Sequence, residues 1–313
     1  MLCNILPDWL YKIISQNYML DDIYEIRLRQ DKPIMVNHKG EYKQLKSNNR
    51  YSGNVLISNV DLINYIIAVA TKQSIYAYNN QIKNCYITTD SGIRIGLCGT
   101  VVYDNGQVST IKNISSLNIR ISHSVLNCSR KILSLLCNEN EVYNTLIISP
   151  PGAGKTTMIR DIVLKLSNEM KVQNILVIDE RYEIAGLNFS KFNLGDGVDV
   201  VSGADKSFAF ENTLKTMSPS VIVTDEVSRE DDIDSIKQTI KSGVKVIATA
   251  HAKNILDLKN KKYFNGLIED KYFERIVVLS KRSGVGTIES VLDENLKTIY
   301  FSNLLWESFW LFF

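Results

Sequence analysis

The spacing of hydrophobic and polar residues changes near residue 140. Upstream of it, short apolar runs are interrupted by Gly, Asn and Asp, which are typical of hairpin turns. Two such stretches are "EIRLRQDKPIMVNHKGEY" at 25–42 and "GIRIGLCGTVVYDNGQVSTI" at 92–111. This pattern predicts a small, strand-rich α+β domain over residues 1–140.

Downstream of residue 140, runs that are apolar on both faces alternate with stretches of helical periodicity. The runs are "NTLIIS", "NILVID", "SVIVTD", "KVIATA" and "RIVVLS". Strands that bury both faces are typical of a parallel sheet covered by helices. The pattern therefore predicts an α/β domain with a parallel-rich sheet over residues 141–290, followed by an apolar, aromatic tail over 291–313.

A glycine-rich turn follows the first of these runs, in "TLIISPPGAGKTTMIRDIV" at 145–163. A phosphate-binding loop needs small residues, a helix N-terminus, a Lys for the terminal phosphates and a hydroxyl for the metal. Ser149 is the one departure from G-x-x-x-x-G-K-[ST], and a chance match is the alternative. The predicted nucleotide contacts are Pro150, Pro151, Gly152, Ala153, Gly154, Lys155, Thr156 and Thr157.

An acidic pair ends another predicted strand, in "SVIVTDEVSRE" at 220–230. Asp225 fits a ligand of nucleotide-bound Mg²⁺, and Glu226 fits a base that polarises the attacking water. The pair could also be a plain helix entry, since Ser228 and Asp231 have the spacing of a capping box. Both interpretations can hold together, because a cap would position the helix behind the acidic pair.

Composition narrows the class of protein. The 313 residues carry 36 basic and 34 acidic side chains, a net charge of +2, so no nucleic-acid partner is expected. The five cysteines lack a CxxC spacing and are interpreted as reduced thiols. No apolar run is long enough to span a membrane, and no signal peptide precedes the first domain. We therefore expect a cytoplasmic protein.

Three motifs, one of them the acidic pair already described, carry a family resemblance. They are "VIDERYEI" at 177–184, "TDE" at 224–226 and "ATAHA" at 248–252. They resemble the acidic box, Walker B and His box of the ring-forming ATPases of type II and type IV secretion and type IV pili. Over residues 20–290 the chain is most similar to one branch, the stage III sporulation protein AA family of endospore-forming bacteria, through "EIRLR" at 25–29, "SIYAY" at 74–78 and "DERYEIAG" at 179–186.

This resemblance implies a RecA-like P-loop NTPase core preceded by the α+β domain, and a role for each box. Asp179, with Thr156 and Asp225, would serve the metal, and Glu183 would act beside Glu226 in catalysis. His251 would sense the γ-phosphate, although a lone His is more often a structural donor. A solvated turn is the alternative for the acidic box.

Ring ATPases also need arginines that reach the phosphate from outside the core. A guanidinium is permanently charged and its fork fits phosphate oxygens. Arg94 and Arg120 alternate with apolar neighbours, as residues on one side of a strand do. Surface charge on an edge strand is the alternative for both.

The tail "TIYFSNLLWESFWLFF" at 298–313 has seven aromatic residues and one charge. Leaving it in water would expose a large apolar patch. A docked terminal element and a protomer contact are favoured over a lipid-facing anchor, because a helix lying on a membrane usually keeps a polar face.

The expected function is ATP hydrolysis with Mg²⁺ in a homo-oligomeric ring, with a hexamer as the expected form. The resemblance implies that the ring serves membrane-embedded channel or secretion proteins around the forespore, from the mother-cell cytoplasm. Two alternatives remain. One is a nucleotide-operated assembly switch with little turnover, and the other is an AAA+ nucleic-acid motor.

Overall fold

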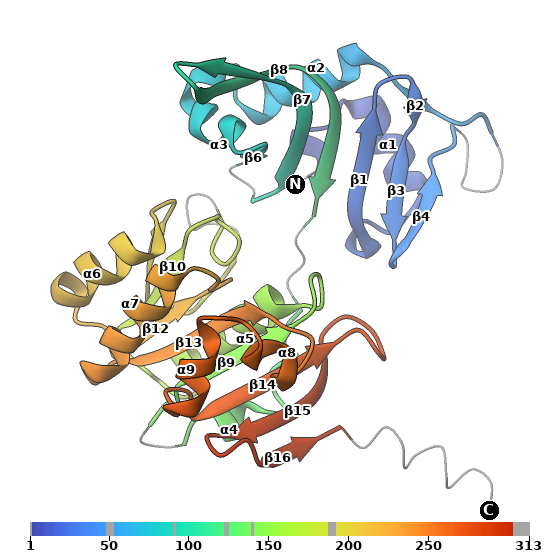
Figure 1. Ribbon diagram of the computed structural model, residues 1–313. Helices are drawn as coiled ribbons and strands as arrows, with labels where there is room; N and C mark the ends of the chain where they lie inside the picture. Colours follow the sequence, from blue (N-terminus) through green and yellow to red (C-terminus); the bar gives the residue numbers. More distant parts are fainter. Residues whose placement is uncertain are drawn as a thin grey trace, which may run out of the picture. The chain divides into compact units, whose positions relative to one another are not determined.

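The computed structural model describes residues 2–47, 53–89, 92–121, 125–138, 141–186 and 192–302. The chain forms two compact units, Met1–His123 with Gly186–Lys191 and Ser124–Ala185 with Phe192–Phe313 (Figure 1). The division lies upstream of residue 140, where the hydrophobic pattern changes. The reason is that the short helix α4 (Leu133–Leu136) and the turn before it bury Ile132 and Leu136 in the core of the second unit.

The first unit is an antiparallel sheet with helices packed on one face. Residues alternate along its strands, so that Ile26 and Leu28 point into a core that also holds Leu10 and Ile63. The strand order is β4-β3-β1-β8-β7-β6, beside a small β2-β5 pair. The elements are η1 (Leu2–Asn4), α1 (Asp8–Asn17), η2 (Leu20–Asp22), β1 (Ile23–Arg29), β2 (Lys32–Pro33), β3 (Met35–His38), β4 (Glu41–Gln44), β5 (Ile57–Ser58), α2 (Val60–Ala70), η3 (Ile75–Tyr78), α3 (Asn79–Lys83), β6 (Tyr86–Thr88), β7 (Arg94–Asp104) and β8 (Gln107–Arg120).

The second unit is a doubly covered α/β sheet, in the order β11-β10-β12-β13-β9-β14-β15-β16. The strands from β11 to β14 are parallel, and β15 and β16 are antiparallel additions. Its elements after α4 are β9 (Thr145–Ser149), α5 (Lys155–Asn168), β10 (Ile175–Asp179), β11 (Val198–Ser202), α6 (Lys206–Met217), β12 (Val221–Thr224), α7 (Glu230–Lys241), β13 (Lys245–His251), α8 (Ile255–Lys259), α9 (Phe264–Glu269), β14 (Arg275–Ser280), β15 (Thr287–Asp293) and β16 (Thr298–Phe301).

The parallel strands of this sheet place side chains in two cores, one on each face, which explains their continuous apolar runs. Along β9, Ile147 packs with the α5 residues Ile159 and Ile162, whereas Ile148 packs with Ile233 of α7. Helices α4 and α5 thus cover one face and α6, α7, α8 and α9 the other (Figure 1). The five apolar runs all form parallel strands, as the sequence predicts, and the predicted α/β class with its parallel-rich sheet is confirmed.

The N-terminal cap of α7 differs from the sequence prediction by one residue. Arg229 is the N-cap, and the Oδ2 atom of Asp232 accepts from the backbone N–H groups of Ser228 and Arg229, both at 3.1 Å. The prediction of Ser228 and Asp231 as the capping pair was therefore wrong. Asp232 lies on the buried side of the helix and can turn back toward the cap, whereas Asp231 is exposed.

Part of the apolar tail belongs to the sheet. β15 crosses residue 290, and β16 pairs with it, so that Tyr300 packs against the α5-side core. Residues 303–313, which include Trp306 and Trp310, lie outside the described residues. Within the described part of the chain, no helix combines the length and apolar character that a membrane crossing requires.

Candidate nucleotide site

The glycine-rich turn connects the carboxyl end of β9 to the first residue of α5. Gly152 and Gly154 have φ values of +69° and +93°, which residues with a side chain rarely adopt. Pro150 and Pro151 lie in the same turn, and Thr156 and Thr157 follow in the first turn of α5. The turn thus presents a helix N-terminus and small residues at one edge of the parallel sheet, where ligands of such sheets bind.

Ser149 does more at this turn than replace a glycine. Its hydroxyl donates to the Pro150 carbonyl at 2.7 Å and lies 3.1 Å from Lys155 Nζ. The Lys155 ammonium also lies 2.9 Å from His251 Nδ1. Burial lowers the pKa of Lys155 to about 8, while the Glu226 carboxylate opposes that shift. Ser149 and His251 therefore hold the lysine at the base of the turn.

His251 and Glu226 meet beside Lys155, from two neighbouring strands. His251 ends β13, Glu226 follows β12, and His251 Nε2 lies 3.6 Å from Glu226 Oε1. The other carboxylate oxygen of Glu226 accepts from Arg181 at 3.0 Å. Burial and the nearby Lys155 lower the pKa of His251, which keeps Nδ1 free to accept from the lysine. The strand order β12-β13-β9 brings these residues together from distant parts of the sequence.

Asp225 is the buried member of the acidic pair. Its Oδ1 atom has no hydrogen-bond partner among the described residues, and Lys206 Nζ lies 3.7 Å away. Burial raises the pKa of Asp225 to about 8, with Asp179 adding to the rise and Lys206 opposing it. A buried carboxylate oxygen without a partner is a good ligand for a divalent cation.

Asp179 and Arg160 shape the acidic box. Asp179 accepts from three successive backbone N–H groups, those of Glu183 at 2.7 Å, Ile184 at 3.0 Å and Ala185 at 2.8 Å. From the other side, the buried Arg160 donates to the carbonyls of Glu183 and Ile184. Both carboxylate oxygens of Asp179 thus hold the backbone of residues 183–185 in place. The role of Asp179 as a metal ligand stays a prediction.

Lys206 is a site residue that sequence reasoning missed. Only 3% of its side chain is exposed, and Nζ donates to Glu180 Oε2 at 2.6 Å besides facing Asp225. Arg229 extends this network to Glu180 and Asp205. A lysine that follows a helix N-cap carries no local signal of burial, so only the packing of α6 against β10 identifies it.

The residues present fit a Mg²⁺·nucleotide group. Thr156 and Asp225 offer a hydroxyl and a carboxylate at the same edge of the sheet as the glycine-rich turn. Among the described residues, no group of three or more His, Cys, Asp or Glu side chains is placed to hold a metal by itself. Mg²⁺ usually takes only one or two carboxylates from the protein and completes its shell with phosphate and water oxygens, which suits this arrangement.

The two predicted arginines lie in the first unit. Arg94 and Arg120 are cross-strand partners on β7 and β8. The Arg94 guanidinium lies 4.7 Å from the Tyr86 ring centroid, and Arg120 Nε lies 4.0 Å from Glu25 Oε2 with 62% of its side chain exposed. The strands β7 and β8 are interior strands of the sheet, so the alternative of an edge strand is wrong, although Arg120 does lie at the surface. Their action on a phosphate stays a prediction.

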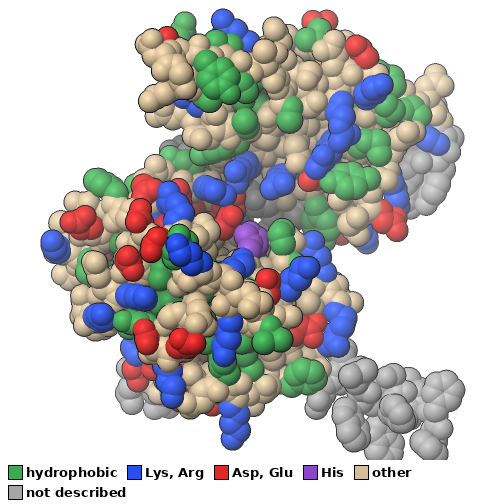
Figure 2. Space-filling view, viewed as in Figure 1, with side chains coloured by type: hydrophobic (Ala, Val, Ile, Leu, Met, Phe, Trp, Pro, Cys, Tyr) green, Lys and Arg blue, Asp and Glu red, His purple; other side chains and the backbone are tan. Residues whose placement is uncertain are grey.

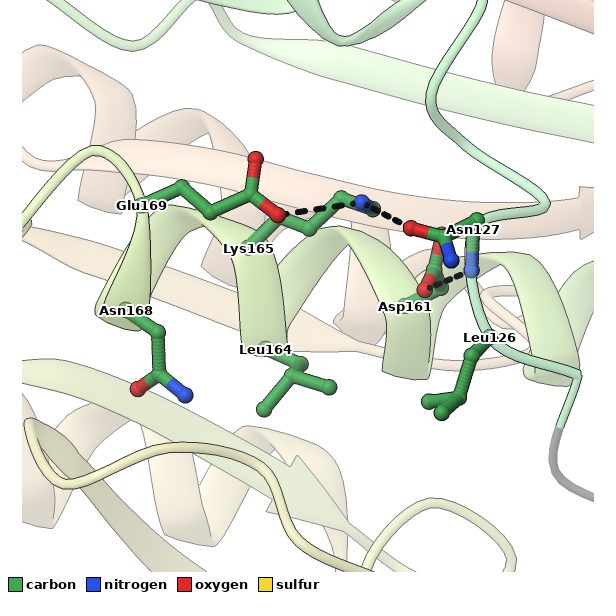
Figure 3. A pocket seen from close by; sticks show the side chains of 7 residues that line it. All are labelled: Leu126, Asn127, Asp161, Leu164, Lys165, Asn168 and Glu169. Atoms are coloured by element: carbon green, nitrogen blue, oxygen red, sulfur yellow. Dashed lines mark hydrogen bonds and ion pairs between the residues drawn. The ribbon is translucent and has the colours of Figure 1, made fainter.

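A separate cavity of about 160 Å³ lies beside α5 (Figure 3). Asp161 accepts from the Asn127 and Ser129 backbone N–H groups, both at 2.8 Å, and from the Ser129 hydroxyl. Lys165 bridges Asn127 and Glu169 across the same cavity. These polar groups are hydrogen-bonded to one another. At this cavity, residues 127 and 129 near the start of the second unit are therefore held against α5.

Comparisons with known proteins agree with this fold. The DotB ATPase of Yersinia pseudotuberculosis superposes with a TM-score of 0.60 at 15% identity, over 88% of this chain and 76% of that one. The pilus retraction motor PilT, solved with bound ADP, gives 0.57 at 15% identity, over 87% and 78%. The fold is that of the RecA-like secretion ATPases, with an N-terminal domain before the core.

The sequence comparisons identify the branch. The chain belongs to the family described as "Sporulation stage III, protein AA", whose family model matches residues 1–299. A relative named stage III sporulation protein AA, from Bacillus subtilis, is 31% identical over 303 residues, which cover 94% of this chain and 95% of the relative. The predicted family resemblance is confirmed.

Proposed function

We propose that this sporulation protein is a Mg²⁺-dependent ATPase. The observation that carries the proposal is the meeting of Lys155, His251 and Glu226 at one end of the sheet, with Asp225 beside them. A lysine for the phosphates and a carboxylate that can accept a proton from water, both at a glycine-rich turn, suit phosphoryl transfer to water, and His251 adds a donor beside them. The fold similarity to ATPases supports this assignment.

In this proposal, the glycine-rich turn binds ATP through its backbone N–H groups. Lys155 donates to the terminal phosphates in place of its present contacts with Ser149 and His251. Thr156 and Asp225 would hold Mg²⁺, and Asp179 would support it from the folded acidic box. When bound, Mg²⁺ neutralises charge on the phosphate oxygens.

Glu226 supplies the base in the chemical step. One of its carboxylate oxygens takes a proton from water while the water oxygen bonds to the γ-phosphorus. The bond to the bridging oxygen breaks, and ADP leaves with the electron pair. His251 and Glu183 line the reacting centre, with His251 donating to the γ-phosphate. Arg181 pairs with Glu226 Oε2, so Oε1 is the oxygen placed to take the proton once His251 turns to the γ-phosphate.

Assembly and partners extend the proposal. We infer a homo-oligomeric ring, hexameric in form, in which Arg94 or Arg120 completes the site. The ring would work with membrane-embedded channel or secretion proteins of sporulation, from the cytoplasmic, mother-cell side of the forespore membranes. No nucleic-acid partner is included, since acidic and basic side chains are interspersed over the face of the second unit that Figure 2 shows.

The test is a steady-state phosphate-release assay on Glu226→Gln, with Glu230→Gln as the matched control. Glutamine keeps the shape of Glu226 but accepts no proton, so we expect turnover to fall by about 100-fold or more while ATP affinity changes less than about threefold. Glu230 is exposed in the first turn of α7, and its variant should hydrolyse ATP normally. Unchanged turnover in Glu226→Gln would remove Glu226 as the base.

One observation favours a second candidate, a nucleotide-operated assembly switch with little turnover. Both oxygens of Glu226 already face cationic or imidazole groups, Arg181 and His251. If ATP binding left those contacts in place, the base would stay unavailable. The same assay separates the candidates, because a switch would bind ATP tightly, release almost no phosphate and show no difference between the wild type and Glu226→Gln.

Adding DNA to the assay tests the remaining alternative, a nucleic-acid motor. Such a motor should release phosphate faster when DNA is present.

A further inference from the structure

The connection between β14 and β15, residues 281–286, packs directly on the glycine-rich turn. The Gly286 backbone N–H donates to the Ala153 carbonyl at 3.1 Å. A Cβ atom added to Gly154 would lie 3.2 Å from Val285 Cγ1 and 3.2 Å from Gly286 N. This contact follows from the topology, since β14 is the parallel neighbour of β9 and both strands end at the same edge of the sheet.

Lys281 is the first residue of this connection, and its amino group lies over the turn. A Cβ atom on Gly152 would lie 3.1 Å from Lys281 Nζ. Lys281 is exposed and forms no ion pair with any carboxylate in the described part of the chain. The next residue provides a contrast, because Arg282 is paired with Glu289 at 2.8 Å. An ammonium without a counterion therefore stands beside a turn whose backbone suits an anion.

We propose that Lys281 is a second phosphate-contacting lysine, which binds the polyphosphate of the nucleotide together with Lys155. The proposal rests on the proposed nucleotide-binding function and adds Lys281, the first residue of the 281–286 connection, to the site. Lys155 approaches from the base of the turn, where Ser149 and His251 hold it. Lys281 approaches from the outer side over Gly152, so the two cations would bracket the phosphates. A flexible lysine on an exposed stem can reach a phosphate without moving the backbone.

Binding of a fluorescent ATP analogue and of its ADP counterpart to the full chain tests this role. Lys281→Met should raise both dissociation constants by about 5- to 10-fold at low salt, because one charge-assisted contact is lost at a partly exposed site. Lys281→Arg should keep most of the affinity, and the matched control Arg282→Met should stay within about twofold of the wild type. The difference between the wild type and Lys281→Met should shrink in high salt, since exposed ionic contacts are screened.

The outcomes separate this inference from the proposed function. Wild-type affinity in Lys281→Met, or an equal loss in Arg282→Met, would overturn the role of Lys281. Lys155→Ala is measured alongside, and we expect it to lose nucleotide binding. If Lys155→Ala bound the analogue as well as the wild type, the glycine-rich turn would not be the site and both proposals would fall. If only Lys281→Met matched the wild type, the nucleotide site would stand without its second lysine.

Discussion

The charge state of Asp225 depends on its surroundings more than on its type. Its carboxyl group is buried at the end of β12, near the Asp179 carboxylate, and Lys206 Nζ lies 3.7 Å from it. Burial and the second carboxylate favour the protonated form, whereas Lys206 favours the ionised form. With a pKa of about 8, Asp225 carries its proton over much of the neutral range.

We therefore expect Mg²⁺ affinity to rise with pH. A metal displaces the proton, so the affinity in the presence of ADP should increase on the order of tenfold between pH 6.5 and pH 8.5 and then level off. Magnesium titrations followed by nucleotide fluorescence measure this. Asp225→Asn should bind Mg²⁺ weakly and remove the rise, which controls for protonation of the nucleotide itself. The same affinity at both pH values in the wild type would show that Asp225 is ionised throughout.

At the scale of elements, α5 connects the nucleotide site to the start of the second unit. Its first residue is Lys155, and two turns later Asp161 fastens residues 127 and 129 by three hydrogen bonds. The same helix carries Arg160, which folds the acidic box. One helix thus positions the lysine, the acidic box and the incoming chain, so a disturbance at any of them can reach the others.

Replacing Asp161 should therefore destabilise the second unit. Asp161→Ala leaves the buried backbone N–H and hydroxyl of Ser129, and the partly buried N–H of Asn127, without their acceptor, so the free energy of unfolding should fall by about 2 kcal/mol. Urea unfolding followed by circular dichroism measures the change. Asp234→Ala, which removes an exposed carboxylate from α7, is the control and should stay within about 0.5 kcal/mol of the wild type. Equal losses of unfolding free energy in the two variants would mean that the hydrogen bonds of Asp161 contribute little to stability.

At the scale of the whole molecule, the predicted arginines and the candidate nucleotide site lie in different units. Arg94 and Arg120 are held as a cross-strand pair in the first unit, whereas Lys155 and Glu226 lie in the second. If an arginine acts on the phosphoryl group in transit, it must come from a separate unit of the same chain or of a neighbouring chain. If it comes from a neighbouring chain, hydrolysis depends on assembly.

Mixing two inactive variants tests whether that arginine acts across protomers. Arg120→Ala should reduce turnover at least tenfold with little change in ATP affinity, because the charge acts in the transition state. An equal mixture with Lys155→Ala should recover up to about a quarter of wild-type activity, since one interface in four would pair an intact turn with an intact arginine. Wild-type specific activity should also rise with protein concentration. No recovery, together with activity that is independent of concentration, would contradict the ring.

Local pattern in the sequence was enough for the two kinds of sheet and for the glycine-rich turn. An apolar run that buries both faces predicts a parallel strand wherever it lies, and Gly152, Gly154 and Lys155 carry their chemistry within a few residues. The alternation around Asn105-Gly106 likewise predicts a hairpin, and both residues have the positive φ that such a turn needs. These features depend on neighbours along the chain, so sequence spacing determines them.

The tertiary structure decided what surrounds those residues. Lys206, Arg181 and Lys281 join the site from elements that are distant in sequence, because strand order and helix packing set which side chains meet. The start of the second unit and the place of β16 were also decided this way, since burial of Ile132 and Tyr300 depends on the core they pack against. A sequence records which residues can be buried, whereas their partners are fixed only when the whole sheet forms.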